Sequence, residues 1–422
     1  MSRRSSRLPR GPRRWRFLAV ISVAALAVAA WVAPLGHRLL ASPDGPGGAD
    51  FGDPLPGLTA DQLAVFEQGK EDFEDVEGPE DGVGPVFNGS SCAECHAGPA
   101  TGGGSARFAV YFGRRVSGRF DPMIDFGGPN IQAQGVIGLN GFQFQGEVVP
   151  RQATIVARRR ATSTFGFGLV DAVPDDALRT LAMMQSRSTP FTAGRPNEVT
   201  NLRTGRRAVG RFGWKAQGGT LLDFAAGAYK DELGVTTAGF VRDGQGRNIG
   251  EENAPQGRVD LLRFNPLASP NEADQEDVES LANFMRLLAP PPRGPVGFAE
   301  QRGERIFAAI GCNNCHIPSL TTGSSPVNAL SRVTFSPYSD FLLHDMGRLG
   351  DGVEQGSARG AEMRTAPLWG LRTQPSFLHD GRASSIADAI LMHEGQGAGS
   401  QQQFRRLSAQ QRRELLAFLN SL

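Results

Sequence analysis

The chain has 422 residues, of which 44 are lysine or arginine and 43 are aspartate or glutamate, so its formal net charge is only +1. This balance excludes the strongly basic proteins that bind nucleic acid through their overall charge. The length allows two or three domains, each with its own core. The 54 glycines and 28 prolines predict long loops between short regular elements.

The first 40 residues differ from the rest of the chain. Seven arginines between Arg3 and Arg16 form a basic head, and the stretch from Phe17 to Leu35 that follows is almost wholly apolar. A basic head before an apolar stretch is typical of an export signal, and this stretch is also close to the length that spans a bilayer. Residues 1–40 are therefore predicted to be a cleaved signal peptide or a retained N-terminal membrane anchor, with the bulk of the chain outside the cytoplasm.

Composition also suggests where the domains divide. Residues 41–57 are rich in glycine, proline and aspartate and are predicted to be a linker. The run Pro290-Pro291-Pro292 ends a helical pattern and is the best candidate for a domain boundary. We therefore expect an N-terminal domain with a large insertion over 58–290 and a C-terminal domain over 291–422.

Regular elements are predicted in chain order from capping signals and apolar periodicity. Residues 107–115 alternate apolar and polar side chains and predict a strand. The acidic run from Glu67 to Asp81 indicates a solvated face or a docking face for a basic redox partner. Helices are expected over residues 59–75, 175–186, 221–232, 274–288, 301–310, 385–393 and from 408 to the C-terminal end. These elements predict a mainly α fold with long loops and a few short strands.

All four cysteines of the chain fall in two Cys-x-x-Cys-His motifs. The motifs are Cys92-Ala93-Glu94-Cys95-His96 and Cys312-Asn313-Asn314-Cys315-His316. In such a motif both thiols bond covalently to the vinyl groups of haem c, and the histidine binds the iron from one side. A disulfide framework does not place a histidine after each second cysteine, and a four-cysteine zinc site would require two distant motifs to converge.

The motifs therefore predict two covalently bound haem c groups. Cys92 and Cys95 are expected to attach the first haem, and Cys312 and Cys315 the second. His96 and His316 are the expected iron ligands. Each attachment site is expected to lie in its own cytochrome c-type haem domain. Attachment of haem c takes place outside the cytoplasm, which agrees with the export signal.

The remaining histidines are unevenly placed. The second haem has three candidate partners in the C-terminal third, His344, His379 and His393, whereas no histidine lies between residues 97 and 315. The first haem must therefore borrow a ligand from the far domain, use a methionine or tyrosine, or keep an open face. The methionine and tyrosine candidates are Met123, Met183, Met184, Met285, Tyr111 and Tyr229. One closed and one open haem would suit an oxidising enzyme, whereas a simple electron carrier would close both.

Several stretches between about residues 60 and 400 resemble a known family. They are residues 87–96, 165–174, 210–216, 288–291, 311–316, 342–347 and 365–382. The C-terminal third resembles the bacterial di-haem cytochrome c peroxidase and MauG superfamily. The whole chain is most similar to its di-haem oxidoreductase branch, whose members are also called peroxidases or thiol oxidoreductases.

The resemblance implies roles for several residues around the second haem. His393 falls where the superfamily places the distal ligand of its C-terminal haem, with Met392 as the neighbouring alternative because the peroxidases usually have methionine there. His379 lies in a His-Asp-Gly segment that implies a contact with the haem or with a ligand. His344 is implied either as a ligand or as a group that supports one.

The resemblance also implies roles for residues that serve the reaction. Trp214 matches the tryptophan that lies between the two haems in the peroxidases, although a core tryptophan is an equal alternative. The acid that moves a proton between peroxide oxygens would fall at Asp231 or Glu232, and Glu232 is preferred. Phe224 stands where the peroxidases have a glutamine, which departs from their pattern.

The expected function is that of an exported di-haem oxidoreductase in the periplasm or on the outer face of the inner membrane. A peroxidase-like enzyme would reduce hydrogen peroxide at haem 1, with electrons relayed through haem 2 from a small cytochrome c or similar donor. Related enzymes would oxidise a protein side chain or a thiol. The alternatives are a non-catalytic di-haem electron-transfer cytochrome and a haem-bearing module for iron uptake or sensing.

Overall fold

The computed structural model describes residues 38–39, 49–137, 143–235, 237 and 275–422. The described residues belong to one compact unit. Apart from residues 38 and 39, the predicted export or anchor segment at 1–40 lies outside the described residues, as do residues 41–48 of the predicted linker. In the described ranges no helix combines the length and the apolar character needed to cross a membrane.

A helix is present at each of the seven places where the sequence predicted one. These helices are α1 (Ala60–Glu74), α3 (Asp175–Ser188), α4 (Leu221–Ala228), α6 (Gln275–Leu287), α7 (Phe298–Ala309), α8 (Ile386–Leu391) and α10 (Ala409–Asn420). Two further helices were not predicted, α2 (Phe167–Asp171) and α9 (Ala398–Arg406). Immediately after α4 the chain tightens into one π-helical turn, η4 (Tyr229–Leu233).

Capping groups fix where several of these helices begin. The Thr59 hydroxyl accepts a hydrogen bond from the backbone N–H of Gln62, and the Gln62 side-chain oxygen accepts one from the backbone N–H of Thr59. Ser408 and Gln411 form the same reciprocal pair at the start of α10. Each cap satisfies backbone groups that would otherwise lack partners, which stabilises a helix by about 0.5–2 kcal/mol.

Short strands form five small sheets in the described part of the chain. The largest has the order β4-β3-β6, with β3 (Phe108–Val116) antiparallel to both β4 (Arg119–Asp121) and β6 (Ile155–Arg160). A second has the order β1-β10-β9, from β1 (Arg38–Leu39), β10 (Val333–Phe335) and β9 (Leu320–Thr321). Three antiparallel pairs complete the set: β2 (Val86–Phe87) with β5 (Gln134–Gly135), β7 (Asn197–Thr200) with β8 (Arg207–Gly210), and β11 (Leu343–Asp345) with β12 (Glu362–Arg364).

The expectation of a mainly α fold therefore needs correction, because the described chain is mixed, with helices and small sheets of short strands. The expected strand at 107–115 corresponds to β3. Its partner β6 was missed because its sequence ends in Arg158-Arg159-Arg160, which reads as a solvated loop, yet Arg159 and Arg160 are buried.

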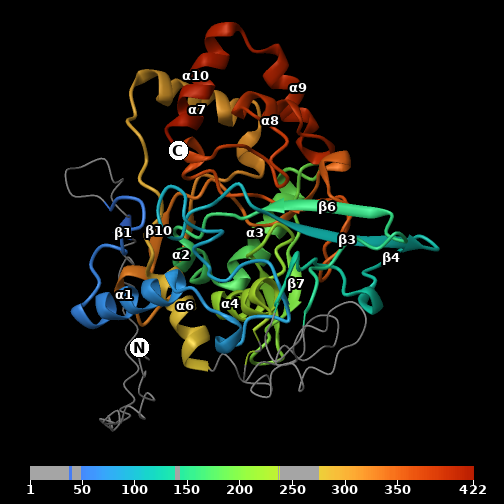
Figure 1. The fold of residues 1–422 in the computed structure, drawn as a ribbon. Helices are drawn as coiled ribbons and strands as arrows, with labels where there is room; N and C mark the ends of the chain where they lie inside the picture. The colour runs from blue at the N-terminus through green and yellow to red at the C-terminus, as the bar shows by residue number, and fades with distance from the viewer. Residues whose placement is uncertain (1–37, 40–48, 138–142, 236, 238–274) are drawn as a thin grey trace, which may run out of the picture. The chain divides into compact units, whose positions relative to one another are not determined.

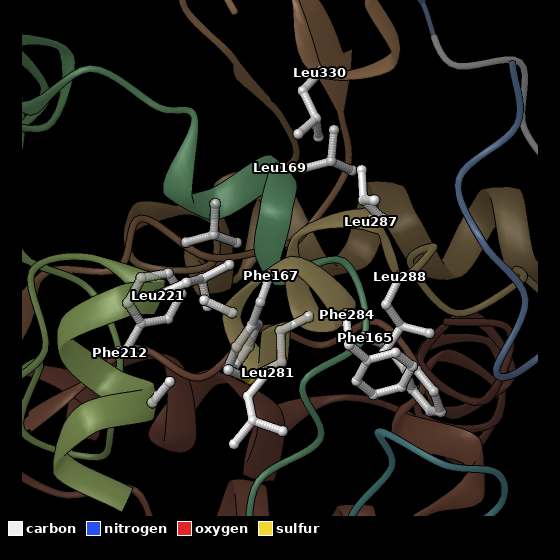
Figure 2. Packing of buried hydrophobic residues seen from close by; sticks show 14 of the residues in the cluster. Phe165, Phe167, Leu169, Phe212, Leu221, Leu281, Phe284, Leu287, Leu288 and Leu330 are labelled. Atoms are coloured by element: carbon white, nitrogen blue, oxygen red, sulfur yellow. The ribbon is translucent and has the colours of Figure 1, made fainter. Parts of the chain in front are cut away.

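The larger apolar cluster surrounds α2 and α6. Figure 2 shows Phe167 and Leu169 of α2 beside Leu281, Phe284 and Leu287 of α6. Helix α6 also packs against α1 and α4. Burying one such side chain contributes about 1.5–3 kcal/mol, so this cluster is the main source of stability for the elements around the first cysteine motif.

A second apolar cluster belongs to the C-terminal helices, which gather together in Figure 1. Its centre is Phe307 of α7, whose ring lies 5.3 Å from that of Phe418 on α10. Gly303 allows the close approach of these two helices, since a Cβ at that position would lie 2.0 Å from the carbonyl oxygen of Glu414. This cluster supports the second cysteine motif, which follows α7 directly.

Candidate functional site

The two Cys-x-x-Cys-His motifs fold into the same tight turn. In the first, the backbone N–H groups of Cys95 and His96 donate to the carbonyl oxygen of Cys92 at 3.2 and 3.1 Å. In the second, those of Cys315 and His316 donate to the carbonyl oxygen of Cys312 at 3.4 and 3.0 Å. Each turn thus brings two thiols and one imidazole to the same short piece of chain, as attachment of one haem requires.

The imidazoles of His96, His316 and His393 share a specific orientation. Their Nδ1 atoms lie 3.1, 2.9 and 2.8 Å from the carbonyl oxygens of Gly103, Tyr338 and Ala389. An Nδ1–H that donates to a carbonyl fixes the tautomer in which Nε2 carries the lone pair. Iron-binding histidines are usually oriented in this way, so these side chains fit a haem. Burial lowers the pKa of His96, and the backbone of Thr162 lies close enough to its ring to oppose this effect.

The thiols of Cys92, Cys95 and Cys312 are held in their protonated form. Burial, with added repulsion from Glu77, raises the pKa of Cys92 to about 12. Burial raises the pKa of Cys95 to about 11 and that of Cys312 to about 12. A thioredoxin-type redox pair needs a cysteine whose pKa is lowered, and none of the four cysteines forms a disulfide. The thiols therefore fit an attachment role better than a dithiol redox role.

The second motif opens into a cavity of about 270 Å³ whose walls are mainly apolar. Cys312, Cys315 and His316 line it on one side, and His393 enters it from the end of α8. The two imidazoles are close enough for His393 to lower the pKa of His316, an effect that adds to that of burial. Met392, the alternative to His393, is 37% exposed and is not among the residues that line the cavity.

His344 also lines this cavity, but both of its ring nitrogens are engaged. Its Nε2 lies 2.9 Å from Oδ2 of Asp340, and its Nδ1 lies 3.4 Å from Sγ of Cys315. Burial opposes the charged imidazolium, yet Asp340 outweighs it and raises the pKa of His344 well above its usual value. Asp340 is itself held by the side chain of Gln185 at 2.8 Å. In this arrangement His344 supports Cys315 and offers no free nitrogen to a metal.

His379 and Trp214 meet at another wall of the same cavity, with their rings 6.1 Å apart. The indole N–H of Trp214 donates to the carbonyl oxygen of Arg160 at 2.9 Å, and the carbonyl oxygen of His379 accepts from the backbone N–H of Arg160 at 2.8 Å. Burial lowers the pKa of His379 to about 4, so this imidazole is neutral at neutral pH.

Residues 160–163 run between the two motifs. All four line the cavity of the second motif. From the same segment, the backbone of Thr162 lies close enough to His96 of the first motif to affect the pKa of that ring. One short strip of main chain therefore touches both candidate haem sites, and Trp214 is bonded to it.

Glu232 lies beside the first motif, in the π-helical turn η4. Its backbone carbonyl accepts hydrogen bonds from Asn88 and Gly89, and its carboxylate accepts one from Nδ2 of Asn88 at 2.9 Å. Burial, with repulsion from Asp231, raises the pKa of Glu232 from 4.5 to about 7. Turns of this kind occur often at functional sites, and a carboxyl with such a pKa can hold or release a proton at neutral pH.

The other candidate ligands of the first haem are scattered. Met123 and Met285 are buried in separate apolar clusters, whereas Met183 and Met184 are 47% and 60% exposed. Tyr229 is buried close enough to Cys92 for the thiol to affect its pKa, which burial raises.

Two further candidate residues pack against aromatic or cationic neighbours. Tyr111 lies under the guanidinium of Arg159, which is 4.2 Å from its ring centre. Phe224, at the position where the peroxidases have glutamine, packs against Phe212 with ring centres 6.0 Å apart, so it brings no polar group to the site.

Sequence reasoning missed the groups that support these residues. Asn88 precedes the first motif by four residues, and Asp340 and Gln185 lie far apart in the chain. A sequence signal existed only for Asp340, which stands four residues before His344.

Comparison with known proteins assigns the family. A model for the family described as "Di-haem oxidoreductase, putative peroxidase" matches residues 146–422. The chain belongs to this di-haem oxidoreductase family. The match includes the second motif, Trp214, Glu232 and His393, whereas the first motif lies before it. Membership confirms the resemblance described above and implies haem cofactors and oxidoreductase activity of a peroxidase type.

Solved structures resemble the chain at low sequence identity. Hydrazine synthase of Kuenenia stuttgartiensis is 15% identical with a TM-score of 0.38, over 96% of this chain and 100% of that one. The di-haem peroxidase BthA of Burkholderia thailandensis is 16% identical with a TM-score of 0.36, over 89% and 87%. A MauG-like protein associated with microbial copper homeostasis is 16% identical with a TM-score of 0.30, over 61% and 89%. No curated protein matched the chain.

Proposed function

We propose that this di-haem oxidoreductase carries two covalently attached haem c groups and reduces hydrogen peroxide at the first site, with electrons that enter through the second. The observation that supports this assignment is an asymmetry. A second histidine, His393, faces the cavity of the second motif, whereas the neighbour of the first motif is Glu232, a carboxyl that can exchange a proton. The overall reaction would take up two electrons and two protons per hydrogen peroxide and release two water molecules.

The residues that would hold the haems follow from the two turns. Cys92 and Cys95 would attach the first haem, and Cys312 and Cys315 the second, by adding each S–H across a vinyl double bond. Nε2 of His96 and Nε2 of His316 would bind the two irons, because Nδ1 of each ring is committed to a backbone carbonyl. A bound haem supplies an iron that exchanges electrons and can accept a small oxidant at an open coordination position.

Glu232 would serve proton transfer at the first site. Its carboxyl is held in place by Asn88 and is sheltered from bulk water, so it can take a proton from one oxygen of the substrate and return it to the other. Its pKa of about 7 matches this task, since neither the acid nor the carboxylate form is strongly favoured at neutral pH.

The second site would store and relay electrons. His316 and His393 would both bind its iron, and the apolar cavity would exclude water and small oxidants. Trp214 lies on the wall of this cavity and is bonded to the strip that reaches His96, so it would favour electron transfer between the sites. The partner would be a small cytochrome c or similar donor, in the periplasm or at the outer face of the inner membrane.

The absorption and electron paramagnetic resonance spectra of the haem-loaded protein test this proposal. We expect one low-spin iron and one high-spin iron in the half-reduced protein. Hydrogen peroxide should change the high-spin signal and oxidise the low-spin iron, because the second haem supplies one of the two electrons. Two irons that are low-spin and do not react with hydrogen peroxide in any redox state would instead establish a non-catalytic electron-transfer cytochrome. Covalent attachment is tested separately by mass spectrometry of the denatured chain, which should retain two haem groups.

A further inference from the structure

A cage of oxygen atoms surrounds the ammonium group of Lys215. Its Nζ lies 3.1, 3.1 and 2.6 Å from the carbonyl oxygens of Arg359, Gly360 and Glu362, and 3.0 Å from Oδ1 of Asp351. The side chains of Lys215 and Asp351 are 0% and 2% exposed. A buried ammonium is stable only when its donors and charge are satisfied, and this cage does both.

The cage belongs to a larger buried charge network. The other carboxylate oxygen of Asp351 accepts from Nε of Arg159 at 2.7 Å, and the Arg159 side chain is 3% exposed. One buried anion is thus shared by two buried cations. The three backbone carbonyls turn their negative ends toward Lys215 and so offset the extra positive charge.

The choice of lysine at this position is itself informative. Only three of the 44 basic residues are lysines, at positions 70, 215 and 230, so the chain uses arginine almost everywhere else. A guanidinium is planar and wide, whereas an ammonium is a compact charge that suits a small cage of oxygens. Burial lowers the pKa of Lys215 to about 8, so the group is still protonated at neutral pH.

The cage joins two walls of the cavity at the second motif. Lys215 directly follows Trp214, and the carbonyl oxygen of Trp214 accepts from the backbone N–H of Arg364 at 2.9 Å. The carbonyls of the cage belong to the segment that leads into β12, which carries Met363 and Arg364. Trp214, Met363 and Arg364 all line the cavity.

We propose that Lys215 is a positioning residue, a built-in cation that fixes Trp214 and the wall at residues 359–364 in their places around the cavity. This role goes beyond the proposed peroxidase activity, because Lys215 would position the cavity wall in the same way whichever group the cavity binds. Its charge is essential to this role, since a neutral side chain of equal length would remove one donor from each of three buried carbonyls and leave Asp351 in an ion pair with Arg159 alone.

Hydrogen exchange of the full chain tests the proposal through Lys215→Ala. We expect exchange to become faster by about ten-fold or more in residues 213–217 and 351–364, as for the loss of a buried hydrogen bond, with the helices α7 and α10 unchanged. Propylammonium, which can refill the cage, should restore protection, whereas propanol should not. Lys70→Ala, at a partly exposed lysine of α1, is the matched control and should change neither segment.

Two outcomes would overturn the proposal. One is exchange in Lys215→Ala equal to that of the unaltered protein, and the other is equal rescue by propanol, which would mean that volume matters and charge does not. If Lys215→Ala fails to fold, amine-reactive labelling of the unaltered chain still decides. Lys215 should resist labelling until the chain unfolds while Lys70 reacts, and equal reaction of both lysines would contradict the caged ammonium.

Discussion

The two cysteine motifs have the same local structure and different surroundings. Both form a turn closed on the carbonyl of the first cysteine, and both histidines donate Nδ1–H to a backbone carbonyl. The second motif, however, opens into an apolar cavity that contains His393, whereas the first lies beside Glu232 on a π-helical turn. Local sequence therefore sets how a haem would be attached, and residues distant in the chain set what each site can do.

The surroundings also differ in how they are built. The second motif rests on α7, α8 and α10, whose apolar side chains form a cluster within the C-terminal third. The first motif packs against the cluster around α1 and α6, while Glu232 arrives from a segment more than a hundred residues further along the chain. The first site thus depends on long-range packing, and variants that act on one site should leave the other intact.

The largest effect is expected from removing the cysteines of one motif at a time. Cys92→Ala with Cys95→Ala should abolish attachment at the first site and leave one covalent haem, and Cys312→Ala with Cys315→Ala should do the same at the second. Each thiol is the sole covalent anchor for its vinyl group. Mass spectrometry of the denatured chain measures this directly. Loss of both haems from either double variant would show that the two sites are not independent.

The next effect concerns peroxide chemistry at the first site. Glu232→Gln keeps the hydrogen bond partner of Asn88 but cannot exchange a proton, so peroxide turnover should fall by about a hundred-fold to ten-thousand-fold. The spectrum of the second site should stay the same. Glu67→Gln, at an exposed position of α1, is the control and should keep full turnover. Normal turnover by Glu232→Gln would remove this residue from the mechanism.

A smaller and more local change is expected at the second site. His393→Ala should remove one ligand from the second iron and convert its low-spin signal to high-spin, because His344, which also lines the cavity, has both ring nitrogens engaged. The first site should keep its own signal. Met392→Leu serves as the control, since Met392 is partly exposed. A spectrum that changes in Met392→Leu and not in His393→Ala would reassign the ligand to methionine.

Helices and attachment motifs could be predicted from the sequence because their signals are local. Thr59 and Ser408 begin helices through groups three residues away, and each Cys-x-x-Cys-His motif contains its whole turn. Strand β6 could not be predicted, since the burial of Arg159 depends on Asp351, which lies 192 residues away. The engagement of His344 was hidden in part, because Asp340 stands only four residues before it whereas Cys315 lies 29 residues away in the chain.

The smallest effect expected is on stability, and it distinguishes the two sites by pH. Glu77 and Glu232 lie near the first motif, and burial followed by carboxylate repulsion raises the pKa of each from 4.5 to about 7. Between these values the two carboxyls bind more protons in the folded chain than in the unfolded chain, so their contribution to the free energy of unfolding should fall as pH rises from about 4.5 to 7.

This decrease should amount to no more than about 3 kcal/mol for each group, and denaturant unfolding at a series of pH values measures it. Glu232→Gln should flatten part of the slope and Glu77→Gln another part, since an amide does not titrate. Glu67→Gln should leave the slope as it is. A slope in the double variant Glu77→Gln/Glu232→Gln equal to that of the unaltered chain would mean that neither carboxyl is protonated in the folded chain. The first site would then lack the exchangeable proton that distinguishes it from the second.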